Sequence, residues 1–272
     1  MTSSMTSRCS ATRTNMQLFR LLCVIAFALL PMSLCRAQGV AFRVVKSVEP
    51  FNAITVAPNI NVTLVMSDEA AMLPNDVVRR IMDKKGALIA NRLCVARGEP
   101  TVIKAVECSV EGNSLTISAA KFKFKKSKRI DVYVVCDTAL TLIHGTSGGN
   151  IQTRGCLRLA DVTIKADYAQ DIHIGAHANS VRIVAANHSS IRLTGNAQTV
   201  DATLSSASKL TATSFTTLST SLSAADESRA NIVVTESANI SASGQSTVRI
   251  RSTPTASIDI NKDESSQVVV EK

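Results

Sequence analysis

The stretch "VRIVAANHSSIRLTG", residues 181–195, places two short alternations of apolar and polar residues on either side of a polar turn. Val181 stands ten residues before Ile191, and Ile183 stands ten residues before Leu193. Strict alternation is typical of a β-strand that buries one face. The stretch therefore predicts a strand, a turn and a second strand.

The same unit recurs through the second half of the chain. Apolar pairs ten residues apart begin at intervals of about 19 residues. A single unit has too few apolar side chains to offset the cost of ordering its backbone, about 1–2 kcal/mol per residue, whereas stacked units share one interior. The pairs are Val162 and Ile172, Val181 and Ile191, Val200 and Leu210, Leu222 and Ile232, Ile240 and Ile250, and Ile258 and Val268.

These repeats predict an all-β fold, a right-handed parallel β-helix or solenoid with coils of about 19 residues. Equivalent residues of successive coils should lie about 4.8 Å apart and form ladders of Val, Ile and Leu. Parallel crossover connections are overwhelmingly right-handed, which sets the expected winding. An antiparallel sandwich is the competing fold, although it gives no reason for the register to persist over six units.

The chain divides into three expected parts. Residues 1–37 resemble a signal peptide, residues 140–272 should form the solenoid repeats, and residues 38–139 should form a short, less regular β segment. That segment has an inserted helix or loop at about 73–105. Its one plausible helix is "PNDVVRRIMDKKG", residues 74–86, where apolar residues share one face and a glycine can end the helix.

The N-terminal segment has the features of a secretory signal. Arginines precede the apolar run at residues 21–34, and small residues suit cleavage after Ala37. An uncleaved membrane anchor is the alternative, but the run is shorter than the roughly 20 residues that span a bilayer. Leu34 precedes Cys35 where a lipoprotein signal needs a small residue. We therefore expect a secreted or cell-surface protein whose membrane contact is limited to the cleaved signal segment.

Composition and charge narrow the function classes. Removal of residues 1–37, which hold four Arg and no acid, lowers the formal charge from +9 to +5. Much of the remainder lies in "KFKFKKSKR", residues 121–129, where a strand would place both Phe on one face. The other face, a candidate contact for polyanions or an ordinary solvated surface, would carry Lys121, Lys123 and Lys125. Base-stacking aromatics are not interleaved there, so nucleic acid is not an expected partner.

Four cysteines follow the signal segment: Cys94, Cys108, Cys136 and Cys156. An even number in an exported protein favours disulfides. Cys136 and Cys156 are about one coil apart, so they should lie on adjacent coils within bonding distance and leave Cys94 to pair with Cys108. Small, buried, unpaired thiols are the alternative.

The sequence shows no strong catalytic or metal-binding pattern. Its densest polar cluster contains Asp167, Asp171, His173 and His177, and alternation places His173 on the outer face of a strand. No serine stands in a G-x-S-x-G context. We therefore expect neither an enzyme nor a cofactor. Parallel β-helices also include polysaccharide lyases and hydrolases, so a carbohydrate-active β-helix enzyme is the alternative.

Three segments carry a family resemblance. They are "FNAITVAPNINVTLVM" at 51–66, "VECSVEGNSLTIS" at 106–118 and "IDVYVVCDTALTLIHGTSGGNI" at 130–151. In this order they resemble the putative auto-transporter adhesin head GIN domain family of secreted and surface proteins. The family's later turns tend to be Gly/Ser, whereas here only "SGQST" at 243–247 keeps a glycine. The resemblance implies a surface or envelope protein with a binding or structural role and transfers no catalytic residues.

Together these features predict a secreted or surface-exposed, non-enzymatic protein that is adhesin-like or structural and presents a Ser/Thr-rich face. Glycans or other surface polymers are the expected partners, and the sequence does not indicate an oligomeric state. Candidate glycosylation sites, relevant only in a host that glycosylates secreted proteins, are Asn61, Asn187 and Asn239.

Overall fold

The computed structural model describes residues 41–46, 50–90, 92–119, 130–168 and 170–272. The signal segment therefore lies outside the described residues, and so do Lys121, Lys123 and Lys125.

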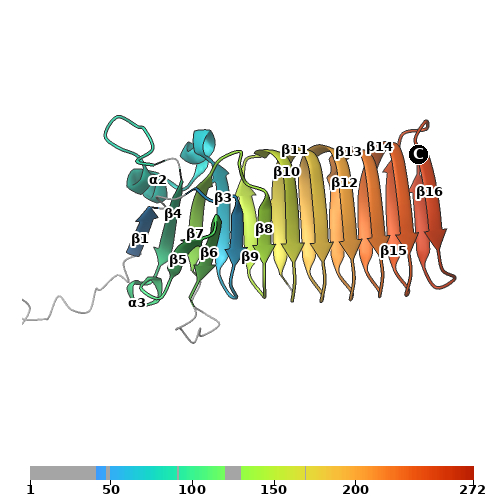
Figure 1. Ribbon diagram of the computed structural model, residues 1–272, viewed down its shortest axis with the longest axis horizontal. Coiled ribbons are helices and arrows are strands. Elements are labelled where there is room, and N and C mark those ends of the chain that lie inside the picture. The colour runs from blue at the N-terminus through green and yellow to red at the C-terminus, as the bar shows by residue number, and fades with distance from the viewer. Residues whose placement is uncertain (1–40, 47–49, 91, 120–129, 169) are drawn as a thin grey trace, which may run out of the picture. The chain divides into compact units, whose positions relative to one another are not determined.

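Five long strands form the regular part of a parallel β-solenoid (Figure 1). Each pairs in parallel with the next, and the register carries Val181 onto Val200, a step of 19 residues. The predicted solenoid is thus confirmed. The strands are β10 (Leu157–Ala166), β11 (Asp171–Ala185), β12 (Ser190–Leu204), β13 (Lys209–Ala224) and β14 (Arg229–Ala242).

Each coil contributes to two sheets. The first half of β14 pairs with β15 (Thr247–Ser252), and its second half pairs with β16 (Ser257–Lys262). The last strand, β17 (Gln267–Glu271), pairs with β15. Leu210 from the first sheet and Val200 from the second both line one internal cavity of about 10 Å³. The two sheets therefore face each other across the core.

Apolar ladders fill the space between the sheets, as the repeat predicted. One column comes from the first sheet and one from the second, and every member is at most 1% exposed. The columns are Ile172, Ile191, Leu210, Ala230 and Val248, and Ile164, Ile183, Ala202, Leu222 and Ile240.

The turns between coils keep a glycine-like conformation without glycine. Ala207 has φ 59° and His188 has φ 62°, although the left-handed region costs a residue with a Cβ roughly 1–2 kcal/mol. The stacked turns recover hydrogen bonds in exchange: Ala207 N–H donates to the Asp226 carbonyl at 2.7 Å, and Glu227 N–H donates to the Gly244 carbonyl at 2.7 Å. Glycine is therefore dispensable in most of these turns.

A column of buried polar side chains closes each turn. These residues are at most 5% exposed, and the carbonyls of all but the last, Ser266, accept backbone hydrogen bonds from the next coil. The column was not predicted, because serine in a polar turn gives no sequence signal of burial. It contains Gln170, Ser189, Ser208, Ser228, Ser246 and Ser266.

The parallel stack extends into the N-terminal half. Six short strands continue both sheets, in the order β6–β2–β8–β10 on one side and β7–β3–β9–β11 on the other. Residue 140 is therefore not the start of the stack. The strands are β2 (Ala53–Val56), β3 (Asn61–Met66), β6 (Ser114–Ser118), β7 (Asp131–Cys136), β8 (Leu142–Gly145) and β9 (Asn150–Arg154).

Antiparallel strands complete this half. β4 (Leu93–Gly98) pairs with β7 on one side and with β1 (Ala41–Lys46) on the other. β5 (Glu107–Glu111) forms a hairpin with β6, and α3 (Pro100–Ile103) lies between β4 and β5 in the chain. The segment preceding residue 140 therefore combines antiparallel pairs with strands of the parallel stack.

A helical layer covers the outer face of β3, β4 and β7. It is formed by η1 (Ser67–Met72) and α2 (Asn75–Ile81), and Ile81 packs in a second core with Val65 and Tyr133. We call residues 67–90 the cover. The predicted helix is confirmed but shorter than residues 74–86, because Met82 is extended and forms a β-bridge with Leu88.

Among the helices that the structure describes, none is long and apolar enough to cross a membrane.

Candidate functional site

The predicted Ser/Thr-rich surface lies on the second sheet of the coils. Strand alternation turns short polar side chains outward, each exposed or half-exposed, while their neighbours enter the core. We call this surface the serine face. It comprises Thr199, Asp201 and Thr203 of β12, Ser219, Ser221 and Ser223 of β13, Ser237, Asn239 and Ser241 of β14, and Ser257, Asp259 and Asn261 of β16.

A shallow depression of about 340 Å³ lies within the serine face. Hydroxyl, amide and carboxylate groups line it, including those of Ser221, Asn239 and Asp259. The hydroxyls of Ser219 and Ser237 are hydrogen-bonded at 2.8 Å along its wall. Such short side chains lose little conformational entropy when a ligand orders them. The depression therefore offers hydrogen-bond donors and acceptors to a polar ligand.

Cys94 and Cys108 lie side by side, as the sequence predicted for this pair. Their Sγ atoms are 2.6 Å apart, one on β4 and one on β5. A hydrogen bond from Cys94 lowers the pKa of Cys108, and the Arg43 guanidinium lowers it further. The same hydrogen bond raises the pKa of Cys94. Oxidation of this pair to a disulfide stays a prediction.

The expected placement of Cys136 and Cys156 on adjacent coils is wrong. Cys136 ends β7, Cys156 follows β9, and β3 lies between these two strands. The Cys136 thiol instead donates to the Val65 carbonyl at 3.4 Å, and burial raises its pKa to about 12. It therefore resembles the small, buried, unpaired thiol of the alternative interpretation.

The three candidate glycosylation asparagines differ in access. The Asn187 amide donates to Asp167 at 2.6 Å, and the Asn61 amide donates to Asp131 at 3.4 Å. Asn239 is exposed on the serine face. An attached glycan would therefore disturb an existing contact at two of these positions and would cover the depression at the third.

The histidine cluster does not converge into a site. His173 is exposed on β11, as alternation predicted, and His177 Nδ1 is 3.0 Å from Asn196 Oδ1. Within residues 41–272, apart from the gaps given above, no group of three or more His, Cys, Asp or Glu is placed to hold a metal ion.

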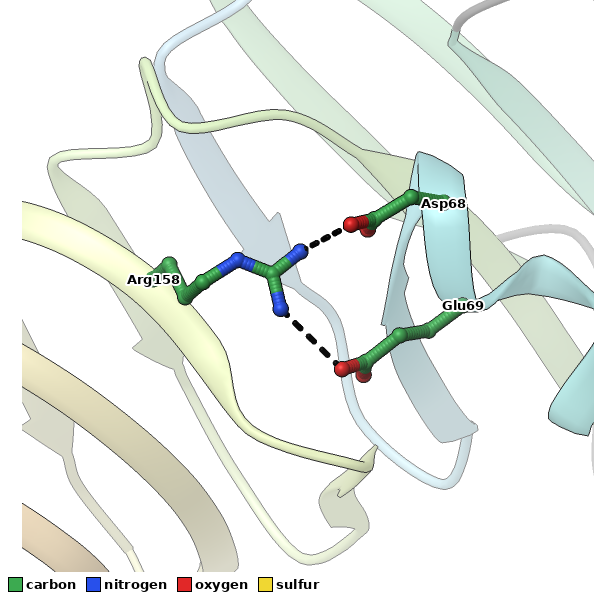
Figure 2. Close-up of polar contacts among 3 residues, drawn as sticks. All are labelled: Asp68, Glu69 and Arg158. Atoms are coloured by element: carbon green, nitrogen blue, oxygen red, sulfur yellow. Dashed lines mark hydrogen bonds and ion pairs between the residues drawn. The ribbon is translucent and has the colours of Figure 1, made fainter.

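An ionic cluster joins the cover to the coils (Figure 2). Arg158, at the start of β10, binds Glu69 at 3.1 Å and also binds Asp68. Gly155 leaves room for this contact, because a Cβ there would lie 2.0 Å from Glu69 Oε2, and its φ of 72° already disfavours other residues. About 90 residues separate the partners, so no local spacing revealed the cluster. The two carboxylates share one guanidinium, and the contact links the cover to β10.

The sequence matches the model of a protein family. A family model described as "Putative auto-transporter adhesin, head GIN domain" matches residues 91–254. The chain belongs to this GIN domain family. No curated protein matches it. The resemblance seen in the sequence is thus confirmed, and it places the chain among adhesin-like proteins.

Solved structures share the GIN domain fold. A putative adhesin from Bacteroides fragilis has a TM-score of 0.69 at 15% identity, covering 86% of this chain and 98% of that one. A putative lipid binding protein from Parabacteroides distasonis has a TM-score of 0.59 at 12% identity, covering 86% and 97%. A putative adhesin from Parabacteroides merdae has a TM-score of 0.52 at 12% identity, with the same coverage as the second. At these identities the likeness establishes the fold.

Proposed function

We propose that this GIN domain protein is secreted or surface-exposed, and that it acts by binding, without catalysis, through its serine face. Glycans or other envelope polymers are the proposed partners. Family membership supports an adhesin-like role, and the signal-like N-terminal segment supports export.

The serine face carries this proposal. Its hydroxyl and amide groups repeat at the strand spacing of about 4.8 Å, so an extended polymer meets similar donors and acceptors on successive coils. Uncharged hydroxyls form hydrogen bonds with the hydroxyls of a sugar, and the depression can hold one stretch of the polymer. A polar, water-exposed surface of this kind binds weakly per contact and gains from repetition.

A glycan array probed with the purified protein tests the proposal. We expect glycan binding that falls about tenfold in a variant carrying Asn239→Ala and Asp259→Ala, because both line the depression. Thr101→Ala is the control, since Thr101 is exposed on α3, outside the coils. Equal binding by the double variant and the parent would contradict the proposed site.

The enzyme alternative has a direct test. Incubation with a panel of acidic polysaccharides should yield no new reducing ends and no unsaturated products. Time-dependent product that disappears with serine-face substitutions would overturn the non-catalytic proposal.

A further inference from the structure

The outer surface of the first sheet carries a concentration of positive charge that the serine face lacks. Over β12–β15 its outward residues are Ser190, Arg192 and Thr194, then Lys209, Thr211 and Thr213, then Arg229, Asn231 and Val233, then Thr247, Arg249 and Arg251. Five of these are cations and none is Asp or Glu. We call Arg192, Lys209, Arg229, Arg249 and Arg251 the basic face. Among the serine-face residues, none is Lys or Arg.

This arrangement costs stability. Lys209 and Arg229 are direct partners in the register of neighbouring strands, where like charges repel. Within the described residues, no salt bridge involves Arg192, Lys209, Arg229 or Arg249. By contrast, Arg182 of the second sheet lies near Asp201, its register partner. Uncompensated repulsion of this kind is relieved when an anion binds across the cations.

The surface of the basic face also has a depression that could accommodate part of a polymer. A depression of about 250 Å³ lies beside Arg249 and Arg251. Thr213 and Asn231 line it as well, and so does one acid, Glu271 of β17, the register partner of Arg251. Arg251 is held in place because its guanidinium donates to the Thr213 carbonyl at 3.3 Å. Arg192 and Arg249 are three strand steps apart, a span of about 14 Å across the strands. A partner that contacts all of these cations would therefore be extended and carry repeated negative charges.

We propose that the basic face binds a linear acidic polysaccharide, one with carboxylate or sulfate groups. Arginine suits such groups because its planar guanidinium can donate two parallel hydrogen bonds to them. Thr211, Asn231 and Thr247 lie between the cations and can bond sugar hydroxyls. The proposal goes beyond the serine-face function, because it assigns a second, electrostatic surface on the opposite sheet.

Two other polyanions fit this surface less well. The basic face carries none of the exposed large apolar side chains of the described residues, which are Met72, Ile89, Tyr168, Leu218 and Ile260. It therefore has no side chain to insert into a bilayer. It also lacks aromatic rings on which bases of a single-stranded nucleic acid could stack.

Binding of heparin and polygalacturonate to the whole protein tests the proposal, with dextran as the neutral control. We expect both acidic polymers to bind, dextran not to bind, and affinity to fall as salt rises. A variant with Arg192→Gln, Lys209→Gln, Arg229→Gln and Arg249→Gln should lose at least about tenfold in affinity. Its dependence on salt should flatten, and its thermal unfolding should match or exceed that of the parent.

A matched variant removes the same charge elsewhere. Arg79→Gln, Lys84→Gln, Lys85→Gln and Lys104→Gln alter exposed cations of the N-terminal half. This variant should bind within about twofold of the parent. Equal losses in both variants would show a net-charge effect and overturn the proposal.

Two further arms separate the sources of negative charge. Stronger basic-face-dependent binding to single-stranded DNA, or to vesicles of phosphatidylcholine and phosphatidylglycerol, than to both polysaccharides would also overturn the proposal. The basic-face variant keeps the serine face intact. Retained binding on the glycan array therefore separates failure of this proposal from failure of the proposed function.

Discussion

The coils and the N-terminal half differ in how many faces of each strand are buried. In the coils, each strand buries one face and leaves the other to solvent, so β14 alternates between buried and exposed positions along most of its length. In β3 and β7 the first residue is half-buried and the other five are buried. The cover accounts for this difference, because Ile81 and Leu73 pack on the side that would otherwise meet water.

The difference separates two roles within one stack. The outward surfaces of the coils face solvent, and over the same strands one sheet carries hydroxyls while the other carries cations. The covered end presents little strand surface, and its residues hold the first coils together. Both proposed binding surfaces therefore lie on the coils, whereas the covered end closes the stack.

Removal of one coil should show how modular the coils are. Deletion of residues 183–201 joins Arg182 to Ala202, which takes the inward place of Ile183. This protein should still unfold cooperatively, at a lower midpoint than the parent. Deletion of residues 183–200 instead places Asp201 in that inward position, and it should cost more than about 4 kcal/mol. Thermal and urea unfolding measure the stability of the two deletion proteins. Similar stability of the two would contradict a stack in which the coils keep a fixed register.

The cover should behave as a core of its own. Ile81→Ala should destabilise the protein by about 2–5 kcal/mol, because Ile81 is fully buried between α2 and the sheet. Lys84→Ala, at an exposed position just after α2, should change stability by less than about 0.5 kcal/mol. Urea unfolding followed by circular dichroism provides the measurement. A cost below about 1 kcal/mol for Ile81→Ala would mean that the cover contributes little to closure.

A disulfide should reinforce the covered end and not the coils. In an oxidising medium Cys94 and Cys108 should link, and the closed loop of about 15 residues should add about 3 kcal/mol. Mass mapping of non-reduced peptides identifies the link, and unfolding with and without reductant measures its contribution. Cys108→Ser should abolish the difference between the two conditions. A peptide linking Cys136 to Cys156 would contradict the strand order, because β3 separates them.

The smallest effect should appear at the far end of the coils. Asp263 accepts hydrogen bonds from Gly244 N–H at 2.8 Å and from the Ser265 hydroxyl at 3.0 Å. Bonds from Ser266 and from Gly244 lower the pKa of Asp263 to about 2. Because the folded value lies below the unfolded one, the stabilisation is present above about pH 4 and disappears as the pH falls through about 2. Hydrogen exchange at Gly244 should rise over that window, and Asp263→Asn should remove the transition.

Alternation allowed the coils to be predicted because each residue's partner stands about one coil away. The alternation around Val181 and Ile183 shows within a few residues which side chains point into the core. The family resemblance pointed to the same fold. The position of β3 could not be predicted this way. Its partners stand far along the chain, and burial on both faces hides its alternation.

Of the two candidate binding surfaces, one could be predicted from the sequence and the other could not. A Ser/Thr-rich face was predicted because nearly every outward position of the second sheet is a short polar residue. The basic face was missed, because Arg192, Lys209 and Arg249 are scattered in sequence among threonines and serines. Only the register gathers them on one surface.

The position of β3 also sets an order of events during synthesis. Its two neighbours in the stack, β7 and β9, are encoded about 70 and 89 residues later. A chain made from its N-terminus must therefore hold an apolar strand without partners until both have followed. Contacts of such long sequence separation slow folding and leave apolar surface open to aggregation in the meantime. The C-terminal coils can each add to the coil before them as they arrive, so the long wait for partners is confined to the N-terminal half.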